Sequence, residues 1–286
     1  MKMGLYYSGG LDWTFTKEPI QSLADLQKMV PQEEDYARYA DAHWTELTDR
    51  YQPALMWNDI NYPKKGKLPE VFAHYYNTVA GGVINNRFGV EFADFTTPEY
   101  SKYDKIVEKK WESCRGLGFS FGFNRAEGPG QVIAADKLVW LLVDIVSKNG
   151  NLLLNIGPHP DGSISEIQMD RLNKLGEWLA VNGEGIFDTR PWVRPAATES
   201  DAPETRFTRT DNSVYAFIEK RPSGDALTIP GVIAAEGTKI RILGSNADSE
   251  WQQRGRDLAV SGHSQVKGEL PLGVRITPAP WQVVKG

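Results

Sequence analysis

Short apolar runs alternate with amphipathic stretches through the first 190 residues. Runs that end at Gly, Asn, Asp or Pro predict short buried strands, and they occupy residues 4–8, 54–59, 83–87, 118–124 and 151–157. Helical spacing of apolar positions predicts helices at residues 33–50, 136–148 and 166–182, and residues 105–114 are interpreted as a short helix. This alternation of strand and helix indicates a β/α architecture with a parallel sheet.

The pattern changes after residue 187. Residues 188–206 are rich in Pro, Thr and acidic side chains, which is typical of a linker. Beyond them, short alternating strands separated by Gly, Asn, Asp and Pro predict a small antiparallel β-sandwich. We therefore predict two domains: a β/α-barrel part over residues 1–190 and a sandwich over residues 191–286.

The stretch at residues 51–63 places a carboxylate where barrel enzymes carry their chemistry. Its apolar run follows a predicted helix and stops at Asn58 and Asp59, before a Pro-Lys-Lys-Gly loop. Side chains at the carboxyl ends of parallel strands face the usual active site of a β/α barrel. Trp57, two residues earlier, shares a strand face with Asp59. From this stretch alone, Asp59 is equally well interpreted as a helix-capping or loop residue.

Composition narrows the classes of function. A net charge of −5 argues against a nucleic-acid partner. No run of about eighteen apolar residues exists, so no membrane span is expected. Residues 1–4 lead straight into a predicted strand, so no signal peptide is expected. Nine Trp residues suit stacking on sugar rings, although such rings more often pack in cores, and the single Cys114 permits no internal disulfide.

Six motifs, taken together and in order, resemble the α-L-fucosidases of glycoside hydrolase family 29. They are residues 4–13 (GLYYSGGLDW), 51–59 (YQPALMWND), 85–89 (NNRFG), 97–100 (TPEY), 118–124 (GFSFGFN) and 150–158 (GNLLLNIGP). The resemblance covers about residues 3–190, and a C-terminal sandwich also fits the family.

The resemblance implies retaining hydrolysis of terminal α-L-fucosides through a covalent fucosyl-enzyme intermediate, and it leaves open whether transfer of fucose to other sugars competes with hydrolysis. Such chemistry uses two carboxyl groups about 5–5.5 Å apart, and neither a cofactor nor a metal is implied. The family's Trp-Asn-Asp motif makes Asp59 the nucleophile. The Thr-Pro-Glu-Tyr motif points to Glu99 as the acid/base, with apolar neighbours that would raise its pKa. Glu127, at another predicted strand end, is a rival candidate.

The resemblance also implies contacts to the sugar. Arg87 matches a sugar-contacting arginine, whose guanidinium can hold a hydroxyl or a carboxylate. Trp57 offers a wall for the fucose ring and its methyl group, and Tyr6 lies on a strand near the barrel mouth. The alternative for Arg87 is a surface position, and for both aromatic residues it is core packing. The expected partner is a fucosylated glycan or an aryl fucoside.

One part of the family pattern is missing from this sequence. Family members normally begin with two further strand-helix units, which carry a Trp and several His residues that bind fucose hydroxyls. We therefore expect an incomplete (β/α)8-type barrel of about six strands. Open strand edges favour pairing with another chain, so we expect a homo-oligomer in which neighbouring subunits close the gap.

Two alternative functions stay open at this point. The chain could be a catalytically impaired fucose-binding protein or a scaffold remnant of such an enzyme. The sandwich could be a carbohydrate-binding module, but Trp251 and Trp281 are its only evident candidates for an aromatic platform. Structural support is the interpretation that we prefer for the sandwich.

Overall fold

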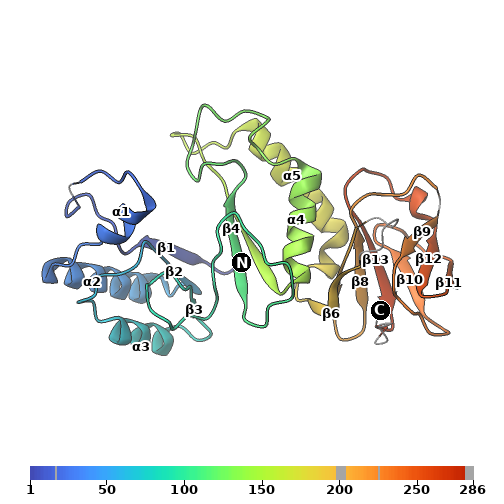
Figure 1. The fold of residues 1–286 in the computed structure, drawn as a ribbon, viewed down its shortest axis with the longest axis horizontal. Helices are drawn as coiled ribbons and strands as arrows, with labels where there is room; N and C mark the ends of the chain where they lie inside the picture. Colours follow the sequence, from blue (N-terminus) through green and yellow to red (C-terminus); the bar gives the residue numbers. More distant parts are fainter. Residues whose placement is uncertain (17, 198–203, 225, 281–286) are drawn as a thin grey trace. The chain divides into compact units, whose positions relative to one another are not determined.

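The computed structural model describes residues 1–16, 18–197, 204–224 and 226–280. The chain forms two compact units, Met1–Thr97 and Pro98–Gly286. Figure 1 follows the chain through both units from the blue N-terminal strands to the red sandwich strands. Each unit is described by itself below.

A three-stranded parallel sheet organises the first unit, in the order β1-β2-β3. Its strands are β1 (Gly4–Ser8), β2 (Leu55–Asp59) and β3 (Val83–Ile84), and its helices are α1 (Leu23–Lys28), α2 (Glu34–Tyr51) and α3 (Leu68–Thr78). The register aligns Tyr6 with Trp57 and Ser8 with Asp59. The carboxyl ends of β1 and β2 therefore lie side by side.

Alternation along β2 decides which side chains face the helices of the first unit. Met56 is fully buried and packs in one cluster with Trp44 of α2, Tyr75 of α3 and Ile84 of β3. Successive side chains of a strand point to opposite faces. Trp57, like Asp59, therefore projects from the face opposite the helices, as the sequence pattern predicts.

The second unit begins with a parallel pair of strands and two long helices. These elements are β4 (Trp111–Gly116), α4 (Ala135–Ser147), β5 (Gly150–Asn155), α5 (Glu166–Asn182) and the 3-10 turn η1 (Gly183–Gly185). The helix expected at residues 105–114 is wrong, because β4 occupies the end of that range. The strand expected at residues 118–124 is also wrong: this segment is a loop.

Tertiary pairing explains both errors. β4 pairs with β5 on one side, and Cys114 of β4 forms a parallel bridge with Glu99 on the other. Because of this pairing, the six residues of β4 form a strand with a largely buried interior, although their local sequence pattern suggests a helix. Residues 118–124 have no partner strand among the described residues. Their apolar side chains stay largely outside, with Phe119 71% exposed.

Helix α4 is buried on two sides, and its nearly continuous apolar sequence reflects this. Leu138 packs in a cluster with Leu152 of β5, while Val139 and Val143 pack in a cluster with Phe217 of the sandwich. Figure 1 shows α4 and α5 between the β4–β5 pair and the sandwich strands. The sandwich is thus packed directly onto the helices of its own unit.

The C-terminal sandwich consists of a five-stranded and a three-stranded antiparallel sheet, in the orders β10-β13-β8-β7-β6 and β11-β12-β9. Its strands are β6 (Arg190–Ala197), β7 (Thr205–Arg209), β8 (Val214–Ile218), β9 (Ala226–Ile229), β10 (Lys239–Ile242), β11 (Trp251–Arg254), β12 (Asp257–Ser261) and β13 (Leu272–Thr277), with a 3-10 turn η2 (His263–Gln265). The sandwich itself was predicted correctly. The linker prediction is wrong at β6, and residues 198–203 and Trp281 lie outside the described residues.

Candidate active site

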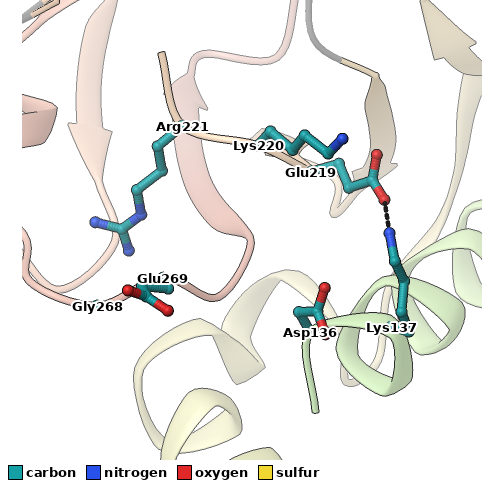
Figure 2. Close-up of a pocket in the computed structure, with 7 residues that line it drawn as sticks. All are labelled: Asp136, Lys137, Glu219, Lys220, Arg221, Gly268 and Glu269. Carbon is teal, nitrogen blue, oxygen red and sulfur yellow. Dashed lines mark hydrogen bonds and ion pairs between the residues drawn. The ribbon is translucent and has the colours of Figure 1, made fainter. Parts of the chain in front are cut away.

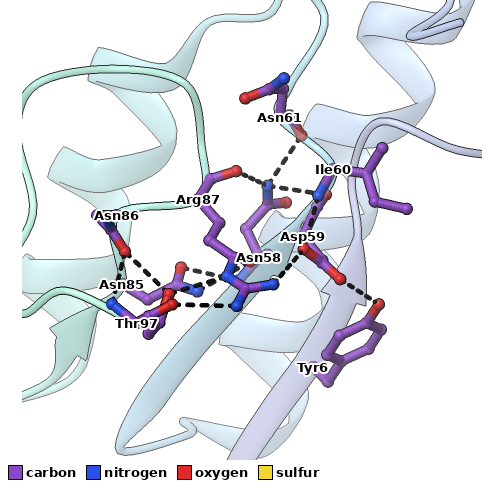
Figure 3. Close-up of polar contacts among 9 residues, drawn as sticks. All are labelled: Tyr6, Asn58, Asp59, Ile60, Asn61, Asn85, Asn86, Arg87 and Thr97. Atoms are coloured by element: carbon purple, nitrogen blue, oxygen red, sulfur yellow. Dashed lines mark hydrogen bonds and ion pairs between the residues drawn. The ribbon is translucent and has the colours of Figure 1, made fainter. Parts of the chain in front are cut away.

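Asp59 lies at the carboxyl end of β2 with both carboxylate oxygens engaged (Figure 3). Its Oδ1 accepts hydrogen bonds from Arg87 Nη1 (3.1 Å) and from the main-chain N–H of Ile60 (2.9 Å). Its Oδ2 accepts one from the Tyr6 hydroxyl (3.0 Å). The carboxylate is therefore held in one orientation, while about a fifth of its side chain stays accessible.

Arg87 is fixed from behind by Thr97. Its Nε donates to Thr97 Oγ1 (2.9 Å) and its Nη2 to the Thr97 carbonyl oxygen (3.1 Å). The side chain of Asn86 accepts in turn from both the N–H and the hydroxyl of Thr97. This chain of hydrogen bonds leaves Nη1 of Arg87 directed at Asp59, as Figure 3 shows.

Two aromatic rings flank the ion pair on the face of the sheet opposite the helices. The rings of Tyr6 and Trp57 stack with centroids 5.5 Å apart, and the Arg87 guanidinium lies 4.6 Å from the centre of the Trp57 ring. Partial desolvation and the neighbouring Asp59 charge raise the pKa of Tyr6 to about 12. Tyr6 therefore remains a hydrogen-bond donor to Asp59 at any physiological pH.

Asn58 and Asn85 join the ends of β2 and β3 beneath the ion pair. The Asn85 side chain accepts from the Asn58 N–H (3.1 Å) and donates to the Asn58 carbonyl (2.9 Å). The side-chain amide of Asn58 donates to the carbonyls of Asp59, Asn61 and Arg87. Both asparagines are fully buried. They fix the separation of the strand ends that carry Asp59 and Arg87.

The sequence analysis named four candidate site residues in this unit, and the structure places all of them in one cluster: Tyr6, Trp57, Asp59 and Arg87. It assigned no role to Asn58, Asn85 or Thr97. The signal for the two asparagines was present, since both lie inside motifs of the resemblance, each next to another Asn or an Asp. A sequence pattern does not distinguish an amide that contacts a ligand from one that clamps two strands.

Glu99 lies in the second unit, beside β4. It forms a parallel bridge with Cys114, and the next residue, Tyr100, donates its main-chain N–H to the Cys114 carbonyl (3.0 Å). The residue is exposed. An acidic side chain on an ordered extended segment fits a proton-transfer role, because its position is set by the backbone while its carboxyl group reaches solvent.

Glu127 also lies in the second unit, but its carboxylate is used within its own loop. Its Oε1 accepts hydrogen bonds from the N–H groups of Phe119 (2.9 Å) and Ser120 (2.6 Å). A side chain on Gly118 would collide with this carboxylate, since an added Cβ would lie 2.1 Å from Oε2. Glu127 thus holds the loop at residues 118–121 in place.

A separate hollow of about 290 Å³ lies beside α4 in the second unit (Figure 2). Its lining is Asp136, Lys137, Glu219, Lys220, Arg221, Gly268 and Glu269. Lys137 and Glu219 pair across it at 2.8 Å. The lining balances three acidic against three basic side chains and has no aromatic wall, which makes it a poor site for a sugar ring.

Neither a metal centre nor a membrane span emerges from the part of the chain that the structure describes. No three His, Cys, Asp or Glu side chains gather there in a way that could hold a metal ion. No described helix is both long enough and apolar enough to cross a membrane.

Comparison with known proteins gives the same family throughout. The sequence model for "Alpha-L-fucosidase" matches residues 1–184. The human plasma alpha-L-fucosidase is 32% identical over 225 residues, covering 72% of this chain and 47% of the human protein. The Thermotoga maritima alpha-fucosidase in complex with fucose is 37% identical, with a TM-score of 0.86 over 97% of this chain and 65% of that one. Its complex with a mechanism-based inhibitor gives 38% identity, a TM-score of 0.88 and the same two coverages.

The chain is shorter than the proteins that it matches. It spans about half the length of the human plasma enzyme and about two thirds of the Thermotoga chain. The matched structures cover nearly all of this chain, including its C-terminal sandwich.

Proposed function

Because the chain belongs to the alpha-L-fucosidase family, we propose that it hydrolyses terminal α-L-fucosides with retention of configuration. Asp59 acts as the nucleophile and Glu99 as the general acid/base. Tyr6, Trp57 and Arg87 contact the sugar or orient the nucleophile. The substrate is a fucosylated glycan or an aryl fucoside, and other sugars compete with water as acceptors.

The reaction proceeds in two displacements. In the first, a carboxylate oxygen of Asp59 attacks the anomeric carbon while Glu99 protonates the glycosidic oxygen, so that the leaving group departs as an alcohol. In the second, the Glu99 carboxylate removes a proton from water, and the water oxygen replaces Asp59 at the anomeric carbon. Two inversions give a product of unchanged configuration.

The oriented carboxylate of Asp59 is the observation that carries this proposal. A nucleophile is effective when its geometry is fixed before the substrate arrives. Two hydrogen bonds hold Oδ1 of Asp59, whereas the Tyr6 hydroxyl contacts Oδ2. Oδ2, on the side of the partly exposed Tyr6 ring, is therefore the oxygen that we assign to the attack.

The local environments of the two glutamates favour Glu99 over Glu127 as the acid/base. The Glu127 carboxylate accepts two main-chain hydrogen bonds, and protonating it would weaken both. Glu99 follows Thr97 by two residues, so the chain keeps its Cα within about 7 Å of the Thr97 Cα. Thr97 in turn binds the guanidinium that orients Asp59.

Azide rescue distinguishes the roles of the carboxylates with one substrate, 4-nitrophenyl α-L-fucoside. In Asp59→Gly, azide displaces nitrophenol directly, and the product is the β-fucosyl azide. In Glu99→Ala, azide attacks the fucosyl-enzyme, and the product is the α-fucosyl azide. Glu127→Gln is the matched control, in which azide forms no adduct. Formation of the α-azide by the Glu127 variant alone would reverse the assignment of the two glutamates.

The same experiment tests the alternative function. If neither the wild type nor any rescued variant releases nitrophenol, while fucose still binds to the protein, the chain is a fucose-binding or scaffold remnant. A carbohydrate-binding sandwich has less support. Trp251 donates its Nε1–H to the Thr238 carbonyl (2.9 Å) and packs against the sandwich core, so its ring forms no open platform.

We also propose that the parallel strands of the two units belong to one β/α-barrel, with the domain boundary near residue 190. Closure of the barrel by a second copy of the chain remains a prediction. Light scattering over a hundredfold concentration range tests it, because self-association requires a mass above that of the 32.0 kDa chain. A constant monomer mass would contradict it.

A further inference from the structure

The two residues that directly follow Asp59 have an unusual main-chain conformation. Ile60 has φ = 57° and Asn61 has φ = 62°, so both lie in the left-handed region. Residues with a Cβ rarely adopt this region, because the Cβ approaches the following carbonyl oxygen, and Gly, Asn and Asp are its usual occupants. A β-branched isoleucine is an outlier there, and it persists only where the surrounding structure imposes the conformation.

Neighbouring groups impose this conformation on both residues. The side-chain amide of Asn58 donates to the Asn61 carbonyl (2.9 Å), and the Asn61 N–H donates to the Arg87 carbonyl (3.1 Å). The turn after β1 packs against the same segment, since a Cβ added at Gly10 would lie 1.6 Å from the Ile60 carbonyl oxygen. The left-handed turn is therefore set by contacts with other segments of the first unit, against the local preference of Ile60.

The strained residue donates one of the hydrogen bonds that orient Asp59. The Ile60 N–H lies 2.9 Å from Oδ1 of Asp59. Figure 3 shows the Ile60 side chain directed away from Arg87, so the main chain of Ile60 is the part that contacts the site. The left-handed region is narrow for a residue with a Cβ, whereas glycine has a much wider range of positive φ. Isoleucine consequently restricts the direction of its own N–H.

We propose that Ile60 is a positioning residue, whose strained main chain holds Oδ1 of Asp59 so that Oδ2 faces the anomeric carbon. The inference rests on the proposed function, in which Asp59 is the nucleophile. Strain at this turn lowers the stability of the first unit, while the restricted N–H fixes the carboxylate before the substrate binds. Relieving the strain should therefore raise stability and lower activity, the opposite directions that such a trade-off requires.

Two substitutions separate the strain from the loss of the side chain. Ile60→Gly and Ile60→Ala both remove the side chain beyond Cβ, but only glycine adopts positive φ without a steric cost. We expect Ile60→Gly to unfold roughly 3–8 °C above Ile60→Ala, whereas at an unstrained position the alanine variant is the more stable. On 4-nitrophenyl α-L-fucoside, kcat/KM of Ile60→Gly should nevertheless lie roughly 5- to 30-fold below that of Ile60→Ala, the effect of loosening one hydrogen bond to a charged oxygen.

Gln52 provides the matched control. It has φ = 43° in the same unit, and it is exposed at the end of α2, where β2 has not yet begun. Gln52→Gly should also unfold above Gln52→Ala, but both variants should keep kcat/KM within about twofold of the wild type. Ile60→Val keeps the branched Cβ and should retain activity, and it replaces Ile60→Ala in the comparison if that variant does not fold.

Azide rescue distinguishes positioning of Asp59 from a general effect on the site. In Asp59→Gly no carboxylate remains for the Ile60 N–H to hold, so adding Ile60→Gly should change the azide-dependent rate by less than about twofold. An equal loss in this background would overturn the inference. So would a Tm of Ile60→Gly below that of Ile60→Ala, which would show that no strain is relieved, or a kcat/KM of Ile60→Gly that equals or exceeds that of Ile60→Ala.

Hydrogen exchange keeps this inference separable from the proposed function. If the wild type releases no nitrophenol, the proposed function fails, and exchange of the main-chain amide at position 60 then tests the restriction of the N–H. After correction for intrinsic rates, this amide should exchange roughly tenfold faster in Ile60→Gly than in Ile60→Ala. Equal exchange in the two variants would refute the role of Ile60 in fixing its hydrogen bond to Asp59.

Discussion

Replacing Asp144 by Asn should lower the stability of the second unit more than any single substitution on its surface. Asp144 of α4 is fully buried, and it accepts hydrogen bonds from Lys148 Nζ (2.8 and 2.7 Å) and from Arg206 Nε of β7 (2.6 Å). Lys102 pairs with it at 2.9 Å. The carboxylate thus links the helix to the sandwich, and Asp144→Asn removes its charge with almost no change in shape.

The size of the effect follows from the burial of the partners. The side chains of Lys148 and Arg206 are only 6% and 12% exposed. Asp144→Asn takes the carboxylate away from both cations, and Arg206 keeps only the exposed Glu204 as an acidic partner, at 3.4 Å. Removing one partner of such a buried pair costs about 3–5 kcal/mol. Lys102 is 42% exposed, and losing its pair adds about 0–1 kcal/mol. For a unit of this size, a loss of about 3–6 kcal/mol in total should lower Tm by roughly 6–24 °C.

The pH dependence provides a second signature. Burial by itself would raise the pKa of Asp144, but hydrogen bonds from Lys148, Arg206 and Lys102 outweigh it and hold this pKa below its usual value. A carboxyl group with a lowered folded-state pKa stabilises the protein above its unfolded pKa of about 4. That contribution is lost as the pH falls through the folded pKa. Asp144→Asn has no carboxyl group to protonate at this position. The free energy of unfolding of this variant should therefore fall less than that of the wild type as the pH is lowered.

Urea unfolding followed by circular dichroism, at pH 7 and between pH 3 and 5, measures both signatures. Lys102→Ala is the control, because it removes only the exposed partner and should change the free energy of unfolding by no more than about 1 kcal/mol. If Asp144→Asn stays within 1 kcal/mol of the wild type at pH 7 with an unchanged m-value, the reasoning about uncompensated buried cations is wrong.

Three further changes test the first unit. Tyr6→Phe removes one hydrogen bond to Asp59 (3.0 Å), so kcat/KM on 4-nitrophenyl α-L-fucoside should fall roughly 3- to 10-fold; a pKa of about 12 for Tyr6 means that this loss is constant from pH 5 to 9. Arg87→Lys keeps the positive charge but loses the planar guanidinium with its several N–H donors, so kcat/KM should fall roughly 10- to 100-fold. Activity within twofold of the wild type would contradict this. Gly10→Ala places a Cβ 1.6 Å from a main-chain oxygen of the turn after β2, so urea unfolding should show a loss of about 1–3 kcal/mol, whereas Gly130→Ala, with open space around it, should show almost none.

The candidate site was predicted from the sequence to the extent that its residues lie on regular elements. Trp57 and Asp59 share a face because strand side chains alternate, and the register of β1 then sets Tyr6 beside Trp57. The direction of the Arg87 guanidinium could not be predicted, because it depends on Thr97, ten residues further along the chain, and on the hydrogen bond from Thr97 to Asn86.

The segments predicted wrongly share one feature. The local pattern at residues 105–124 suggested a helix followed by a strand, but tertiary pairing with β5 and with the Glu99 segment made β4 the strand and left residues 118–124 as a loop. Hydrogen-bond partners far away in the sequence decided there which residues form a strand and which form a loop. Local propensity depends only on neighbouring residues and therefore does not predict this outcome.

By itself, the sequence determined the alternation of strands and helices, the C-terminal sandwich and, through its ordered motifs, the family. These properties depend on neighbours along the chain, where the periodicity of apolar side chains is visible. The tertiary structure alone decided which polar groups meet: Asn58 with Asn85, 27 residues apart, and Asp144 with Arg206, 62 residues apart. The physical reason is that a buried polar group must find its partner in space, and only the folded chain sets which groups lie within hydrogen-bonding distance.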